Sequence, residues 1–235
     1  MSELIPITLD DKKMDVQKGR TILDVCRETG VELPVLCDFK GLGAVGACRL
    51  CLVEIEGVPR LLPACTTTVA PNQVIKTQSE RLQKNRRMIL ELLFSERNHI
   101  CAVCVANNHC ELQKLGYRLG MEHVRFPYLY QQCDMDASHE KYAMDHNRCI
   151  LCTRCVRVCD EVEGAHTKDV MGRGYQARII NDFLQPWGDT TTCTSCGKCV
   201  QVCPTGALFT KNTPQGMLKK DSESISELVE KRNAR

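Results

Sequence analysis

The chain has 235 residues, and its 31 basic and 29 acidic side chains give a net charge of +2, so no charge excess indicates a nucleic-acid partner. Hydrophobic residues make up 43% of the sequence, which is normal for a globular protein, but 17 cysteines are unusually many. No apolar run is long enough for a transmembrane segment, and the first residues lack the apolar stretch of a signal peptide. We therefore expect a cytoplasmic protein whose reduced thiols bind metal.

Residues 1–79 are predicted to form the first domain of an α+β, multidomain chain. Apolar residues alternate along 5–9 and again at 14 and 16, on either side of a polar turn, which predicts a β-hairpin. A helix is expected over 21–29, with Thr21 as its N-cap. Short strands are expected at 52–56 and 72–77.

The first domain contains four cysteines with the spacing C-x10-C-x2-C-x13-C, namely Cys37, Cys48, Cys51 and Cys65. A zinc ion is usually held by two close pairs of cysteines, and only one such pair is present here. The arrangement resembles the β-grasp domain of plant-type ferredoxins, in the longer-gapped form of the large iron–sulfur subunit of respiratory complex I. That resemblance implies one [2Fe–2S] cluster.

The loop between Cys37 and Cys48 contains Gly41, Gly43 and Gly46, which match the dinucleotide-binding pattern G-x-G-x-x-G. That pattern requires a preceding strand and a following helix, and neither is predicted here. We expect the loop to wrap a cluster instead, with its backbone N–H groups directed at sulfur.

Residues 80–140 are predicted to form a second domain, beginning with a helix that Ser79 caps and that runs to about residue 95. Lys84 and Arg87 are expected to face away from its apolar side. That apolar side is predicted to consist of Leu82, Met88, Ile89, Leu92 and Leu93.

Three cysteines follow this helix with the spacing C-x2-C-x5-C: Cys101, Cys104 and Cys110. A cubane [4Fe–4S] cluster needs one more ligand, which a histidine would supply. The run resembles the one-His, three-Cys domain shared by complex I and [FeFe]-hydrogenases, in which the histidine lies four residues before the first cysteine. Arg97 occupies that position here, so we favour His99 as the ligand and keep His109 as the alternative.

Residues 141–218 contain the strongest signal, because the pattern C-x2-C-x2-C-x3-C occurs twice with 33 residues between the copies. The repeat resembles bacterial ferredoxins with two [4Fe–4S] clusters, in which the fourth cysteine of each run binds the other cluster. The resemblance implies one cluster on Cys149, Cys152, Cys155 and Cys203, and another on Cys159, Cys193, Cys196 and Cys199. A hairpin with a strand near 177–180 is expected between the copies.

Two cysteines, Cys26 and Cys133, fall outside all of these sets, and we interpret both as structural. Residues 219–235 are predicted to form a polar helical tail. Ile225, Leu228 and Val229 would form a short apolar stripe on it, which either docks on a partner or belongs to a frayed end.

Nothing in the sequence indicates catalytic residues, since there is no Walker loop, credible Rossmann unit, flavin site or nucleophile–base pair. One [2Fe–2S] and three [4Fe–4S] clusters in one chain indicate one-electron transfer between partners. A zinc-stabilised scaffold without redox function is the alternative from another class.

The order of domains and the run from Ser95 to Gln113 resemble the small diaphorase subunit of bidirectional NAD(P)-reducing [NiFe]-hydrogenases. The resemblance implies an FMN- and NAD(P)-binding diaphorase subunit and the small and large hydrogenase subunits as partners, in the reaction H2 + NAD+ ⇌ NADH + H+. NAD and NADP are not distinguished. Equivalent subunits of an NAD-dependent formate dehydrogenase, a bifurcating [FeFe]-hydrogenase or a complex I-like NADH dehydrogenase remain open.

Overall fold

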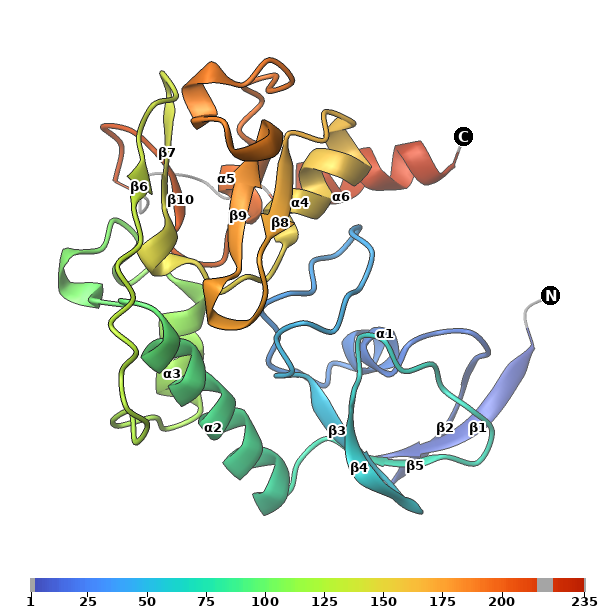
Figure 1. Ribbon diagram of the computed structural model, residues 1–235. Helices are drawn as coiled ribbons and strands as arrows, with labels where there is room; N and C mark the ends of the chain where they lie inside the picture. Colours follow the sequence, from blue (N-terminus) through green and yellow to red (C-terminus); the bar gives the residue numbers. More distant parts are fainter. Residues whose placement is uncertain (1–2, 215–221, 235) are drawn as a thin grey trace.

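A five-stranded sheet forms the N-terminal part of the computed structural model, which describes residues 3–214 and 222–234 (Figure 1). Its strand order is β2-β1-β5-β3-β4. The first two strands form the expected antiparallel hairpin, and β5 joins β1 in parallel. The strands are β1 (Leu4–Leu9), β2 (Lys12–Gln17), β3 (Leu52–Ile55), β4 (Val58–Pro63) and β5 (Val74–Lys76). β4 was not predicted, since the sequence indicated only a turn at its start.

Helix α1 (Ile22–Glu28) packs against this sheet and begins where the sequence predicts. The Thr21 side chain accepts a hydrogen bond from the backbone N–H of Asp24, whose carboxylate accepts one from the Thr21 N–H. This reciprocal capping box satisfies two N–H groups that the helix itself leaves free. Cys26 is fully buried in the same core, and burial raises the pKa of its thiol to about 12, in keeping with a structural role.

Helix α2 (Glu80–Glu96) begins at the expected cap, where the Ser79 side chain accepts a hydrogen bond from the Leu82 N–H. The predicted apolar face is partly wrong. Leu92 is exposed, whereas Leu90, Arg86 and Glu91 are buried. Arg86 lies on the inner face because backbone carbonyl groups there need a donor, and the buried Glu91 carboxylate accepts hydrogen bonds from Arg125.

The C-terminal part contains two small sheets (Figure 1). One has the order β10-β7-β6, and the other is the expected hairpin of β8 and β9. These strands are β6 (Met135–Asp136), β7 (Tyr142–Asp145), β8 (Lys168–Met171), β9 (Arg178–Asn181) and β10 (Leu208–Thr210). The remaining helices are α3 (Glu111–Arg118), α4 (Arg154–Arg157), α5 (Lys198–Val202) and α6 (Ser222–Asn233). A π-helical segment, Val158–Glu163, continues α4.

Helix α6 corrects the expectation for the tail. Ile225 and Val229 are buried against this chain's own C-terminal core, whereas Leu228 is 45% exposed. Residues at i and i+4 therefore form the docking stripe, and the helix covers its own chain. The first residues of the predicted tail, 219–221, lie outside the described residues. Within the described ranges, no helix is long and apolar enough to cross a membrane.

Arg86 joins α2 to the N-terminal sheet. Its side chain is fully buried and donates hydrogen bonds to the carbonyl oxygens of Leu50 at 3.2 Å, Leu52 at 2.8 Å and Thr77 at 2.9 Å. One guanidinium thus satisfies three carbonyl groups that have been removed from water.

We expect Arg86→Met to lower the free energy of unfolding by on the order of 1–3 kcal/mol, because methionine fills the space but leaves buried acceptors unpaired. Anaerobic urea unfolding followed by circular dichroism measures the change. Lys84→Met, an exposed position on the same helix, is the control and should shift stability by less than about 0.5 kcal/mol. Equal effects of the two substitutions would contradict this role of Arg86.

Candidate metal centres

The four cysteines of the N-terminal part lie together and are buried: Cys37, Cys48, Cys51 and Cys65. The Cys37 thiol is within hydrogen-bonding reach of Cys48 and Cys65, and Cys51 is within reach of Cys65. Hydrogen bonds from Cys48 and Cys65 hold the pKa of Cys37 well below its usual range. The sequence distributes these residues over 29 positions, and the fold brings them to one point.

The loop before Cys48 has the expected irregular backbone, with neither strand nor helix between Cys37 and Cys48. Backbone N–H groups of Ala47 and Cys48 face the Cys37 sulfur, as expected. Gly43 differs, because its N–H donates to the Glu161 carboxylate at 2.8 Å. The glycine pattern therefore serves a contact with the C-terminal part of the chain.

The second set lines one cavity, which contains His99, Cys101, Cys104 and Cys110. The His99 Nε2 atom is buried and makes no hydrogen bond within the described part of the chain. Burial, with Arg148 and Arg97 nearby, lowers the pKa of His99 to about 4, so the imidazole is neutral at physiological pH. A neutral imidazole nitrogen is the form that binds metals.

His109 lies elsewhere. It is exposed and does not line the cavity that holds the three cysteines. Arg97, at the position of the histidine in the relatives, is buried and donates hydrogen bonds to the Ala177 carbonyl at 2.5 Å and the Cys133 sulfur at 3.0 Å. Cys133 therefore has a structural contact outside the four sets.

The two C-terminal sets line separate cavities. One cavity is lined by Cys149, Cys152, Cys155 and Cys203, and the other by Cys159, Cys193, Cys196 and Cys199. Each cavity thus combines three cysteines of one run with the fourth cysteine of the other run. The set that includes Cys149 is buried throughout, whereas Cys196 of the other set is exposed.

The chemistry of the donors fits iron–sulfur clusters. Burial raises the pKa of Cys149 and Cys110 to about 11 and that of Cys152 and Cys199 to about 12. Such thiols stay protonated unless a cationic metal core replaces the proton. Among the described residues, no three or more His, Cys, Asp or Glu side chains are gathered to hold a metal ion. That finding concerns a single ion, whereas a cluster would be held by the cysteine sets that share a cavity.

Polar groups that the sequence did not single out surround the C-terminal cavities. The Trp187 indole N–H donates to the Cys193 sulfur at 3.3 Å. The Lys168 ammonium is buried 3.6 Å from the centre of the Trp187 ring and donates to the Asn181 side chain at 2.8 Å. Its positive charge acts on both Cys155 and Cys199. Hydrogen bonds and positive charge near thiolates stabilise the reduced state of a bound cluster.

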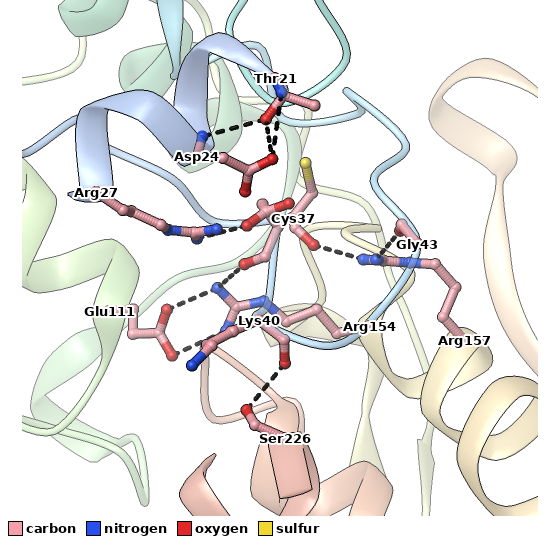
Figure 2. A network of polar contacts seen from close by, with 11 residues as sticks. Thr21, Asp24, Arg27, Cys37, Lys40, Gly43, Glu111, Arg154, Arg157 and Ser226 are labelled. Atoms are coloured by element: carbon pink, nitrogen blue, oxygen red, sulfur yellow. Dashed lines mark hydrogen bonds and ion pairs between the residues drawn. The ribbon is translucent and has the colours of Figure 1, made fainter. Parts of the chain in front are cut away.

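Two arginines on α4, Arg154 and Arg157, connect the C-terminal part to the N-terminal loop (Figure 2). Arg154 forms a bidentate ion pair with Glu111, with both N–O distances 3.0 Å, and donates to the Asp38 carbonyl at 3.0 Å. In the sequence, the only feature that drew attention to these two arginines was their position between candidate ligands in the C-x2-C-x2-C-x3-C motif. A basic residue there was equally compatible with a solvated surface.

Three family descriptions match successive parts of the chain. Residues 2–80 match a 2Fe-2S iron-sulfur cluster binding domain. Residues 86–125 match the NADH-ubiquinone oxidoreductase-G iron-sulfur binding region, and residues 141–209 match the NADH-quinone oxidoreductase subunit 3 ferredoxin-like domain. Fold, cavities and matches define an iron–sulfur protein with [2Fe–2S] and [4Fe–4S] ferredoxin-like domains.

In several relatives, the region that aligns with this chain is part of a longer protein. This chain is 38% identical to the HndD subunit of the NADP-reducing hydrogenase of Solidesulfovibrio fructosivorans. It is 32% identical to the mitochondrial 78 kDa subunit of the NADH-ubiquinone oxidoreductase of Neurospora crassa. The alignments cover 87% and 88% of this chain but only 36% and 28% of those relatives. The chain thus spans about a third of their length.

Another relative matches almost from end to end. The gamma chain of the NAD-reducing hydrogenase HoxS of Cupriavidus necator is 32% identical over 94% of this chain and 95% of its own length. A chain in a crystal structure of NAD+-reducing [NiFe]-hydrogenase superposes with a TM-score of 0.83 and 33% identity, covering 93% of this chain and 98% of that one. The chain belongs to the family of this hydrogenase γ subunit, which confirms the resemblance drawn from the sequence.

Proposed function

We propose that the chain holds one [2Fe–2S] and three [4Fe–4S] clusters. The [2Fe–2S] ligands would be Cys37, Cys48, Cys51 and Cys65. The [4Fe–4S] ligand sets would be His99 with Cys101, Cys104 and Cys110; Cys149, Cys152 and Cys155 with Cys203; and Cys193, Cys196 and Cys199 with Cys159. The grouping of the three [4Fe–4S] sets around three cavities supports this assignment.

The proposed domains are a β-grasp [2Fe–2S] domain at 1–79, a one-His, three-Cys domain at 80–140, and a two-cluster ferredoxin domain at 141–218, followed by a helical tail at 219–235. A mixed sheet crossed by one helix supports the first of these. The cavity shared by His99 and three cysteines supports the second. The exchange of Cys159 and Cys203 between cavities supports the third.

The function we propose is electron transfer between an FMN- and NAD(P)-binding diaphorase subunit and a [NiFe]-hydrogenase module within a cytoplasmic complex. The observation that carries this proposal is the nearly end-to-end match to the hydrogenase γ subunit. Bound clusters would supply one-electron transfer in this chain. The residues of the chain would bind the clusters, shield them from water and set their potentials through charge and hydrogen bonds.

Electron transfer by this chain would be the same with any of these partners. The identity of the partners therefore needs a test of its own. HndD is somewhat more identical in sequence, but this chain covers only 36% of it. Purification of the native complex distinguishes the cases, because recovery with nickel-containing hydrogenase subunits supports the proposal. Recovery with formate dehydrogenase or quinone reductase subunits would contradict it.

The Cys159, Cys193, Cys196 and Cys199 site is the end of the chain that we propose faces the hydrogenase module. Its Cys196 is exposed, and Cys159 and Cys193 are half-buried. A site at the surface lets a partner's cluster approach closely, whereas the fully buried sister site does not.

The metal content is the first test of the cluster assignment. We expect about 14 irons per chain, with matching sulfide and essentially no zinc, in anaerobically prepared protein. Elemental analysis and bleaching of the brown colour by dithionite measure this. A colourless protein with several zinc ions would establish the scaffold alternative instead.

We expect His99→Ala to alter or remove the EPR spectrum of one reduced [4Fe–4S] cluster, because the buried Nε2 atom is lost from its cavity. His109→Ala is the matched control and should leave all spectra unchanged, since that side chain is exposed. The reverse pattern would assign the ligand to His109, and no change in either variant would exclude a histidine ligand.

Cys196→Ser tests, in the intact complex, which end of the chain faces the hydrogenase module. We expect H2-driven NAD(P) reduction to fall at least about tenfold, while NAD(P)H oxidation with an artificial acceptor at the flavin subunit is retained, because only the hydrogenase-facing end is damaged. Cys133→Ser, outside all four sets, is the control for replacing a cysteine. Unchanged H2-driven reduction in Cys196→Ser would refute the assigned end.

A further inference from the structure

Arg157 lies between two of the proposed cluster sites. Its side chain is only 7% exposed, and one of its terminal nitrogens donates to the carbonyl oxygens of both Cys37 and Cys152, the latter at 3.3 Å. The other terminal nitrogen donates to the Gly43 carbonyl at 2.5 Å (Figure 2). Cys37 and Cys152 belong to different cysteine sets, so one guanidinium spans both.

Arg157 forms no ion pair with a carboxylate of the described residues, and the Glu161 carboxylate, four residues later, accepts from the Gly43 N–H instead. The hydrogen-bond acceptors of Arg157 are neutral carbonyls and the Thr153 hydroxyl. Arg154, one helical turn earlier, has Glu111 as its bidentate partner. A buried cation that forms no ion pair is costly, which raises the question of what stabilises the charge of Arg157.

The buried guanidinium bonds the backbone carbonyl of one cysteine from each of two sets. Four thiolates outweigh the positive charge of an iron–sulfide core, so each loaded site is anionic, and reduction adds a further negative charge. We propose that Arg157 is a positioning residue shared by the [2Fe–2S] site of Cys37 and the [4Fe–4S] site of Cys152. It fixes the separation of the two cysteine-bearing loops and stabilises the reduced state of both sites. This inference rests on the cluster assignment proposed above.

The guanidinium shape is essential to this double role. Arginine presents several N–H donors in a rigid plane, whereas lysine carries the same charge on one ammonium group at the end of a flexible side chain. Lysine at this position would retain much of the electrostatic effect but could not hold the Cys37, Gly43 and Cys152 carbonyls together. Substitution by lysine and by glutamine therefore separates charge from geometry.

EPR-monitored redox titration of the complete, cluster-loaded chain tests the proposal. In Arg157→Gln we expect the reduced-to-oxidised ratio at fixed potential to fall about tenfold for the [2Fe–2S] and one [4Fe–4S] signal, equivalent to about 59 mV for one electron. For the other two [4Fe–4S] signals, this ratio should stay within about threefold of the native value. Arg157→Lys should keep the potentials near those of the native protein but change the magnetic interaction between the two affected signals.

Arg173→Gln is the control for the loss of one positive charge, because this arginine of the C-terminal part is exposed. In this variant the reduced-to-oxidised ratio of every signal at fixed potential should remain within about threefold of the native ratio. Unchanged potentials in Arg157→Gln, or a change at one site alone, would overturn the proposal. If Arg157→Gln does not retain iron, Arg157→Lys decides, because a tenfold shift there would exclude the charge role. Zinc in place of iron in the native chain would instead refute the cluster assignment itself.

Discussion

The structure depends on burying sets of thiols that must become anionic together when metal binds. Water cannot stabilise thiolates in the interior, so the protein has to supply N–H donors and positive charge. The amides of Ala47 and Cys48, the indole of Trp187 and the ammonium of Lys168 lie next to cysteine sulfurs or act on them. These four polar groups thus favour negative charge on the cysteine sulfurs.

Helix α4 and its π-helical continuation carry cysteines of two cavities and the arginines that contact the N-terminal loop. Cys155 and Cys159, four residues apart, enter different cavities, while Arg154 and Arg157 turn toward the N-terminal loop. The cavity of Cys149 also shares Thr205 with the cavity of His99. The set of Cys149, Cys152, Cys155 and Cys203 is therefore linked to each of the other three sets through Arg157, Thr205 or α4 with its π-helical continuation.

Local signals in the sequence predicted much of this architecture. Caps at Thr21 and Ser79 located two helices, and the C-x2-C-x2-C spacing grouped three of the cysteines in each C-terminal cavity. The exchange of the fourth cysteine was implied by the resemblance to two-cluster ferredoxins. Contacts distant in sequence could not be foreseen, since Arg157 reaches Gly43 and Cys37 across 114 and 120 residues. Leu228 was assigned to the wrong face for the same reason. An apolar stripe predicts a buried face only when the surface opposite it is known.

The glycines between Cys37 and Cys48 are explained by contacts with residues that are distant in the sequence. Gly41 has φ of +91°, and a side chain there would lie 3.2 Å from Val229 of α6. Gly43 offers its N–H to Glu161 and its carbonyl to Arg157. Small residues are therefore needed where the first cysteine loop meets α4 and α6. A spacing shared with nucleotide-binding loops arises here because two cluster-bearing parts of one chain approach each other closely.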